Sequence, residues 1–354
     1  MPAVKRPLRH ATVAATVLLL TLGVPPAAMA DRTGSGNGGE FGGGTGTDTS
    51  ASGEREGDTL KSGVSGTIVF DRSKNGAGEA TGAVTASSTS WTPPACYYAP
   101  AYTPKEIEAQ MRQVWESSAP SPEWALKTQN HFVNGEPYKD FNKEKEGEGY
   151  WWDAYITEGR ETDPASQECD ELPFWVDEGA APPADVPQAI NVETLAQLAY
   201  AEIRVPSTEV ELAPADATKV NLPTWAWLDT ADFEPVSVTA SVPLLGLSAT
   251  TTAEPVSLEI SPGTDDAVTY PASGQCEIRD GQIGEPYAKG KADETPPCGV
   301  KYLRSSGDGS YKLQATVTWK ISWTSTTGEG GDLPDGQFGA DQDVVVQEIQ
   351  AVNR

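Results

Sequence analysis

The chain is poor in histidine and in basic residues. Its 354 residues include 2 histidines, and 25 Lys+Arg stand against 51 Asp+Glu, giving a formal net charge of −26. His10 lies in a basic N-terminal segment, which leaves His131 for the rest of the chain. A Ser-His-Asp triad or a zinc site built from histidines would therefore have to use His131. We expect no nucleic-acid partner, because binding nucleic acid depends on basic side chains that displace counterions.

The apolar run that follows the N-terminal basic residues is short. It extends from Ala11 to Val24 and ends at Pro25-Pro26, whereas a helix needs roughly 20 apolar residues to cross a bilayer. A small-residue exit at Ala28-Met29-Ala30 follows, which completes the pattern of a secretory signal. We predict that residues 1–30 are a signal peptide, and that the secreted chain has no transmembrane anchor after cleavage.

Cysteine is also scarce, with four in the whole chain. An even number in an exported protein favours disulfides over metal ligation or a catalytic thiol. Three pairings are possible. Cys276 and Cys298 flank a Gly/Pro-rich loop, whereas Cys96 and Cys169 bracket an aromatic-rich region. We therefore predict the pairs Cys96–Cys169 and Cys276–Cys298.

Changes in composition divide the chain after the signal peptide. Residues 31–65 are rich in Gly and Ser and lack the large apolar side chains of a core, so we expect a disordered linker. Residues 66–186 form an aromatic-rich module with one helix. Residues 187–354 form a helix followed by a β-sandwich domain.

Two helices and one turn have clear local signals. Thr103-Pro104 followed by Glu106 predicts a capping box at the start of a helix that ends before Pro120. Asn191 predicts the N-cap of a second helix that ends before Pro206. Residues 67–70 predict a strand that enters a hairpin turn at Asn75-Gly76, although the spacing Asp71, Ser73, Asn75 also resembles half of a calcium loop.

The last third of the chain alternates with a period of two, which is typical of half-buried strands. Alternating apolar residues occupy 236–242, 256–260 and 313–323, and Pro, Gly and Asp turns separate these and other strand-like runs. The fold class we expect is mainly β with minor α. It is an immunoglobulin-like or PKD-like β-sandwich of about seven to nine strands, preceded by a helix and by the disulfide-tied, loop-rich aromatic module.

Aromatic side chains are the candidate ligand-binding residues. Tyr150, Trp151 and Trp152 could form a stacking platform, but neighbouring residues on a strand face opposite ways, so one of the two tryptophans should be core. Trp225 and Trp227 stand two residues apart, on one face of a predicted strand, and could form either a sugar platform or a buried seam.

An enzyme is the competing interpretation. Glycoside cleavage needs a pair of carboxyl groups beside the substrate, and residues 144–163 supply acidic side chains near the aromatic run. The interleaved Lys143 and Lys145 favour a solvated loop instead. The candidates are Glu146, Glu148, Asp153, Glu158 and Glu161.

Nucleotide and metal sites have weaker signals. Residues 284–292 resemble a phosphate-binding loop, but Pro286 removes a backbone donor and Ala292 replaces the Mg²⁺-binding hydroxyl, so we expect no nucleotide. Acidic pairs at Asp265-Asp266, Asp332/Asp335 and Asp341/Asp343 could hold Ca²⁺, although solvated turns are commoner. We expect no cofactor, no metal and no catalytic residue.

Five short sequence segments are similar to those of a known family: WTPPACYY (91–98), PYKDFNK (137–143), VNLPTWAW (220–227), CGVKYLRSS (298–306) and VQEIQ (346–350). Together they resemble an uncharacterised family of secreted actinobacterial proteins over about residues 65–354. That resemblance implies export and brings no catalytic residues. A looser likeness to PKD-type immunoglobulin-like domains of surface proteins rests on residues 258–266 and 299–302, and implies fold class alone.

These observations favour an exported, non-enzymatic protein of the cell surface or secreted space. Its expected role is structural or adhesive, binding an envelope protein or a polysaccharide. The alternative is an enzyme acting on cell-wall glycans through the carboxylates of 144–163.

Overall fold

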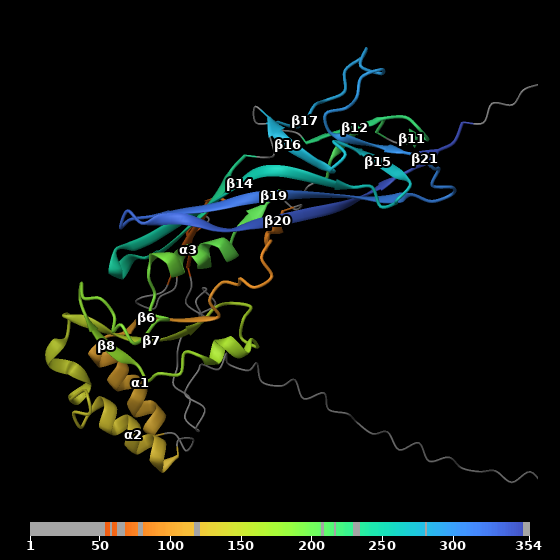
Figure 1. Cartoon of the computed structure of the whole chain (residues 1–354). Helices are drawn as coiled ribbons and strands as arrows, with labels where there is room; N and C mark the ends of the chain where they lie inside the picture. Colours follow the sequence, from red (N-terminus) through yellow and green to blue (C-terminus); the bar gives the residue numbers. More distant parts are fainter. Residues whose placement is uncertain are drawn as a thin grey trace, which may run out of the picture. The chain divides into compact units, whose positions relative to one another are not determined.

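The computed structural model describes residues 68–76, 81–116, 121–206, 209–215, 217–228, 234–279 and 282–349 (Figure 1). Two short strands, β1 (Glu54–Glu56) and β2 (Thr59–Lys61), lie within residues 31–65, for which the sequence predicts a linker. The predicted signal peptide and the rest of residues 31–65 lie outside the described residues. In the described ranges no helix combines the length and apolar character needed to span a bilayer.

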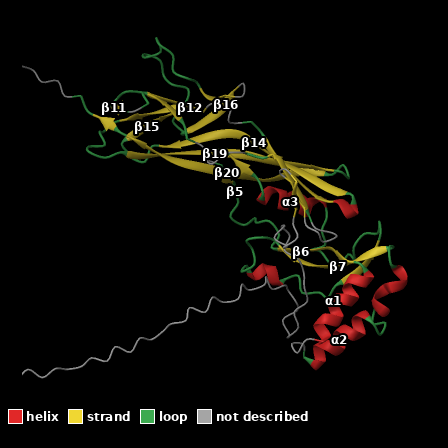
Figure 2. Ribbon diagram, turned by 180° about the vertical axis from the view of Figure 1, so that it is seen from behind, coloured by secondary structure: helices red, strands yellow, loops and turns green. Residues whose placement is uncertain are grey.

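Strands dominate these ranges, and three α-helices and short 3-10 turns accompany them (Figure 2). The helices are α1 (Pro104–Glu116), α2 (Pro122–Phe132) and α3 (Val192–Ala201), and the 3-10 turns are η1 (Asp140–Lys145), η2 (Pro164–Gln167) and η4 (Pro243–Leu245). The remaining strands are β3 (Val69–Lys74), β4 (Gly82–Ala83), β5 (Thr85–Ala86), β6 (Cys96–Tyr102), β7 (Gly149–Ile156), β8 (Phe174–Asp177), β9 (Arg204–Val205), β10 (Glu211–Ala213), β11 (Thr218–Lys219), β12 (Thr224–Leu228), β13 (Val236–Val242), β14 (Leu247–Ser261), β15 (Ala267–Tyr270), β16 (Gln275–Arg279), β17 (Gln282–Gly284), β18 (Gly299–Tyr302), β19 (Tyr311–Ser325), β20 (Gly330–Val344) and β21 (Val346–Gln347).

The pairing of these strands confirms a mainly β protein with antiparallel sheets. Over the described residues, hydrogen bonds connect 14 strands in the order β1-β2-β3-β13-β14-β16-β17-β12-β18-β15, with β5, β10, β19 and β20 off this path. A separate antiparallel sheet has the order β6-β7-β8. Two small pairs, antiparallel β4-β9 and parallel β11-β21, complete the pattern.

Three fifteen-residue strands form the centre of the large sheet, with β19 between β14 and β20. The alternation predicted for 313–323 is present in β19, where the five apolar residues from Leu313 to Ile321 are buried and Trp323 is half-buried. The same is true of β13, whose valines at 236, 238 and 242 face the core. In both strands the period of two therefore identified the buried face.

A register shift in β14 corrects one sequence expectation. Ala249, Thr251 and Ala253 are buried in the first half of the strand, whereas Leu258 and Ile260 are buried in the second. The pairing with β19 slips between Pro255 and Ser257, so the inward positions change from odd to even numbers. Val256 lies at this irregularity and is 39% exposed, although its spacing from Leu258 predicts burial.

Helix α3 packs against β13 and β14 and confirms the second predicted helix. The side chain of Asn191 caps it by accepting a hydrogen bond from the Thr194 amide at 2.8 Å. Leu195, Ala196 and Ala199 are fully buried against the sheet. The Thr251 hydroxyl of β14 donates to the Ala196 carbonyl at 2.7 Å, which ties helix to strand inside the core.

Helices α1 and α2 cover one face of the β6-β7-β8 sheet. The capping box of α1 is confirmed: the Thr103 amide donates to Glu106 Oε2 at 2.7 Å, and the Glu106 amide donates to Thr103 Oγ1 at 3.3 Å. Ile107 and Met111 then meet Trp151 and Phe132 in a separate aromatic cluster. We call this set the aromatic core, and its members are Ile107, Met111, Trp124, Phe132, Phe141, Trp151 and Trp175.

Two local expectations are wrong. The region after α1 is not only loop, because Ser121 and Pro122 begin α2, with the Ser121 hydroxyl accepting from the Trp124 amide at 3.2 Å. Among the described residues, which exclude 77–80, β3 pairs with β13 and β2 and not with a strand that follows the predicted hairpin turn at Asn75-Gly76. The Asn75 side chain instead bonds the Glu202 carbonyl and the Arg204 amide just after α3.

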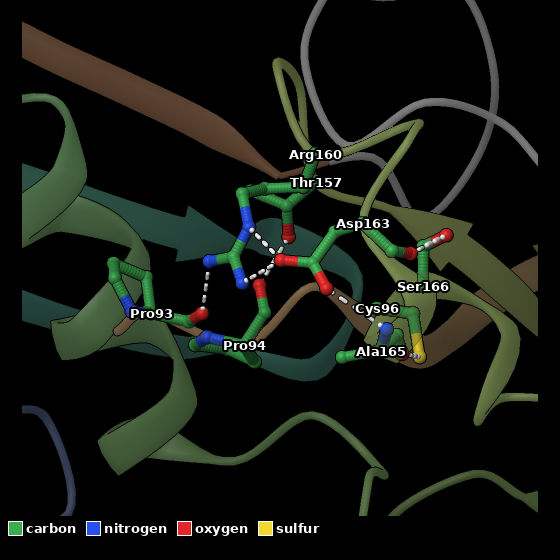
Figure 3. Close-up of polar contacts among 8 residues, drawn as sticks. All are labelled: Pro93, Pro94, Cys96, Thr157, Arg160, Asp163, Ala165 and Ser166. Atoms are coloured by element: carbon green, nitrogen blue, oxygen red, sulfur yellow. Dashed lines mark hydrogen bonds and ion pairs between the residues drawn. The ribbon is translucent and has the colours of Figure 1, made fainter. Parts of the chain in front are cut away.

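Both predicted disulfides, Cys96–Cys169 and Cys276–Cys298, are present. Beside the first, Arg160 contacts Asp163 at 2.5 Å and donates to the Pro93 carbonyl at 2.7 Å (Figure 3). Asp163 in turn accepts from the Ala165 amide at 2.9 Å, at the start of η2. We call Arg160, Asp163 and Pro93 the polar lock, because these contacts hold the segment before β6 against the loop after β7.

We predict that the two disulfides contribute unequally to stability. They close sequence separations of 73 and 22 residues, which the loop-entropy relation converts to about 4 and about 3 kcal/mol. Cys96→Ala/Cys169→Ala should therefore lower the free energy of unfolding more than Cys276→Ala/Cys298→Ala in urea titrations. Reductant that fully reduces the thiols without lowering the melting temperature would contradict this prediction.

We also predict that the polar lock weakens in acid. The Ala165 amide and then Arg160 hold the pKa of Asp163 below its ordinary value of 3.8. A lowered folded-state pKa stabilises the fold above the unfolded value, and this contribution is lost as pH falls through the folded one. The stability difference between the wild type and Asp163→Asn should therefore be constant above about pH 4 and shrink below it. A stability difference that stays constant below pH 4 would contradict this prediction.

Candidate functional site

The site that gathers the most candidate residues is a cleft of about 870 Å³ beside β7. Three groups of residues line it: Tyr150 and Trp152 of β7 with the end of β8, the loop 177–192 that leads into α3, and residues 244–247 around η4. Thr327 and Glu329, in the turn between β19 and β20, complete the rim. Segments far apart in the sequence therefore meet at one concavity of a size typical of ligand sites.

Side-chain alternation along β7 decides which aromatic residues reach the cleft. Tyr150 and Trp152 line it, whereas Trp151 points to the opposite face and is fully buried in the aromatic core. The Trp151 indole donates to the Phe141 carbonyl at 3.1 Å, and its ring lies 4.7 Å from that of Tyr138. Both adjacent tryptophans are in fact core: Trp151 lies in the aromatic core, and Trp152 is 2% exposed in the larger buried cluster that also includes β6, α3 and β19, which we call the main core. Of the three predicted platform residues, Tyr150 alone is half-buried at the cleft.

The walls of the cleft are aliphatic. Leu244, Leu245, Leu247 and Val186 are half-buried and pack against the main core, as does Tyr150. The leucines are presented by η4, whose chain reverses at Gly246 with φ 63°, a left-handed conformation that favours glycine. These side chains keep apolar surface available inside the concavity, which is how many binding sites gain affinity.

Backbone hydrogen bonds from β6 hold the loop that forms one wall. The Tyr98 amide donates to the Gln188 carbonyl at 3.0 Å, and the Ile190 amide donates to the Tyr98 carbonyl at 2.8 Å. Ala189 and Ile190 are buried as a result. This side of the cleft is therefore anchored to the sheet and leads directly into α3.

Carboxylates supply the charge at the rim. Asp177 accepts from Lys145 at 2.9 Å and from the Trp175 indole at 2.7 Å, and these two bonds lower its pKa. Glu178 and Glu329 are exposed. The Glu329 carboxylate accepts from the Thr327 hydroxyl at 2.9 Å. The rim therefore suits a cationic or hydrogen-bond-donating group.

The structure does not bring Trp225 and Trp227 to this cleft. Trp225 is 3% exposed, packs edge-on against Tyr287 and has the Lys291 ammonium 5.3 Å from its ring centre. Trp227 is half-buried. Lys291 belongs to residues 284–292, the segment that resembles a phosphate-binding loop, and it also pairs with Glu285. This segment continues from the end of β17 into turns and loop.

The carboxylates proposed for glycoside cleavage are dispersed. Glu146 and Glu148 precede β7, whereas Glu158 and Glu161 follow it. The eight residues of β7 span about 25 Å, so a pair formed across the strand would exceed the roughly 5–9.5 Å that separates the carboxyl pair of a glycosidase. None of these four glutamates lines the cleft. Asp153 is 2% exposed in the middle of the strand, where its side chain accepts from the Ala154 amide.

His131 belongs to the packing of α2. Its Nε2 lies 2.7 Å from the Pro173 carbonyl oxygen, and its ring stands edge-on to those of Phe132 and Tyr138. Burial lowers the pKa of the imidazole. This environment keeps the ring neutral and already uses one of its two nitrogens.

One member of each acidic pair considered for calcium forms an ion pair with a basic side chain. Asp266 lies 3.4 Å from Arg304, Asp343 lies 2.9 Å from Lys312, and Asp332 lies 3.7 Å from Lys320. The described residues include no group of three or more His, Cys, Asp or Glu side chains that could hold a metal ion.

Comparison of the chain with protein-family models, with curated proteins and with solved structures yields no match.

Sequence reasoning missed most of the cleft. It named Tyr150 and Trp152 but not the leucines at 244–247, Val186 or the rim residues Glu178 and Glu329. A local signal exists in Pro243-Leu244-Leu245-Gly246-Leu247, where an apolar run coincides with a turn and so predicts leucines that no strand face can bury. The pairing of this turn with loop 177–192 has no such signal, because it depends on tertiary structure.

We predict unequal losses of stability for substitutions at two neighbouring residues of β7. Trp151→Ala should lower the free energy of unfolding by about 3–5 kcal/mol, because it empties the middle of the aromatic core. Tyr150→Ala should cost at most about 2 kcal/mol, because the ring is half-buried at the cleft. Urea titrations followed by circular dichroism measure both. Equal losses would mean that the two faces of β7 are packed alike.

Proposed function

We propose that this is an exported, non-enzymatic binding protein of the cell surface or secreted space. Its cleft beside β7 would hold a segment of another envelope protein. The observation that carries the proposal is the cleft itself, where half-buried aliphatic side chains from separate segments meet around Tyr150 and Trp152. None of the five candidate carboxylates lines the cleft, which supports a binding role there over glycan cleavage.

Export is supported by the N-terminal signal pattern and by two disulfides, which persist in oxidising compartments. We also propose that β12–β20 form a variant of the immunoglobulin-like or PKD-like sandwich. Support comes from the stacking of Tyr302 in β18 on Tyr311 in β19, which brings two parts of the large sheet together at 5.2 Å. Such domains commonly serve adhesion, which agrees with the proposed role.

A polysaccharide is the second candidate ligand. It is favoured by Tyr150, whose half-buried ring lines the cleft and could stack on a sugar ring. The aliphatic walls weigh against it, because sugar hydroxyls placed against leucine would lose hydrogen bonds to water without replacement.

A binding screen tests the proposed function. The purified protein is titrated with envelope-protein peptide arrays, peptidoglycan fragments, chitin and cellulose oligosaccharides, while tryptophan fluorescence and product release are read together. We expect a peptide ligand, no products, and affinity at least tenfold lower for Leu245→Asp, because a charge at the cleft wall removes apolar contact worth about 1.5–3 kcal/mol. Leu126→Asp is the matched control, since Leu126 is 59% exposed on α2.

Two results would contradict this function. Product release that disappears in Glu148→Gln or Glu158→Gln, with the fold intact, would establish an enzyme. Binding that is insensitive to Leu245→Asp and to Val186→Asp would place the ligand elsewhere on the protein.

A further inference from the structure

We infer that the cleft selects an aliphatic protein segment that carries lysine or arginine side chains. This inference rests on the proposed function and adds the charge of the partner. It depends on three features of the cleft: where its apolar anchors lie, which charged groups surround them, and which of those groups already have a partner.

The apolar anchors come from two separate segments of the chain, which form two walls of the cleft. Val186 belongs to the loop before α3, whereas Leu244, Leu245 and Leu247 belong to η4 and the start of β14. All four are half-buried and rest on the main core, so their inner sides are fixed while their outer sides face the cleft. An extended segment lying between these walls could insert aliphatic side chains against both.

The charge of the lining has one sign. Among the described residues that line the cleft, Asp177, Glu178 and Glu329 are acidic, and none is lysine, arginine or histidine. Asp177 is already engaged by Lys145 at 2.9 Å. Glu178 and Glu329 form no ion pair with any residue in the part of the chain that the structure describes, so two carboxylates remain for a partner's cations.

Hydrogen bonds hold the backbone of the two residues that carry these carboxylates. The Glu178 amide donates to the Glu148 carbonyl at 2.8 Å, at the junction of β7 and β8. The Glu329 carbonyl accepts from the Ser325 amide at 2.9 Å and from the Ser325 hydroxyl at 2.8 Å. Each side chain therefore leaves the backbone at a defined place on the rim and remains exposed, an arrangement that suits recognition of a basic side chain next to an apolar anchor.

The rest of the protein favours the same partner. A net charge of −26 repels acidic polymers and attracts cationic segments over distances beyond direct contact. Anionic glycans are disfavoured twice, by this long-range repulsion and by the acidic rim. Neutral glycans gain nothing from the rim charge and lose hydrogen bonds at the aliphatic walls.

The test is selection from a random dodecapeptide display library on the immobilised purified protein. Enriched peptides are synthesised and titrated by fluorescence anisotropy against the wild type, Glu178→Gln/Glu329→Gln and Leu245→Asp. Glu158→Gln/Glu161→Gln is the matched control, since it removes two carboxylates from the far end of β7. Val186→Asp serves as a second wall variant, and circular dichroism verifies the fold of each protein.

We expect enriched peptides that combine aliphatic residues with Lys or Arg. Their affinity should fall at least tenfold in the wall variants and about threefold to tenfold in Glu178→Gln/Glu329→Gln, with no change in the control pair. The rim effect should disappear in 0.5 M salt, because exposed ion pairs are screened.

The failures are distinguishable. Peptides that need Leu245 and Val186 but show no cationic bias, or that bind Glu178→Gln/Glu329→Gln unchanged, would overturn this inference and leave the proposed function standing. If no enriched peptide depends on the cleft, both this inference and the proposed function are wrong. In that case Leu245-dependent binding of chitin oligosaccharides, tested on the same proteins, would identify the cleft as a sugar site.

Discussion

The two backbone hydrogen bonds that Tyr98 forms with Gln188 and Ile190 connect the two halves of the described chain. They extend the edge of β6 by one more segment, and that segment continues directly into α3. Because α3 packs on β13 and β14, the aromatic sheet and the large sheet share one continuous core. The loop wall of the cleft lies within this connection, so its geometry follows from the pairing at Tyr98.

The cleft also separates two tasks along a single strand. One face of β7 fills the aromatic core with Trp151, and the other presents Tyr150 to the concavity and packs Trp152, which is 2% exposed, into the main core. Stability and recognition can therefore be altered independently by substitutions at adjacent residues. The acidic rim adds a third element that has little influence on folding, since exposed carboxylates contribute weakly to stability.

Local signals predicted the parts of the fold that depend on local physics. The capping residues Thr103 and Asn191 placed α1 and α3, and period-two alternation identified β13 and β19. The disulfide pairing followed from composition on either side of the cysteines. What failed needed knowledge of distant partners: β3 has the turn signal of a hairpin but pairs with β13, more than 160 residues later in the chain. The irregularity at Pro255–Ser257 and the sheet β6-β7-β8 were missed for the same reason.

Of the candidate site, Tyr150 and Trp152 were accessible from sequence, whereas Val186, Glu178 and Glu329 required the tertiary arrangement.

The Cys96–Cys169 bond has a mechanical consequence. A chain pulled from its two ends lengthens only through residues outside its covalent loops. This disulfide removes 73 residues from that path, equivalent to about 250 Å of extended chain, and these residues include β7 and both helices of the aromatic core. Tension can thus separate the segments on either side of this module, while the strand that carries Tyr150 and Trp152 stays inside a loop that cannot be drawn out.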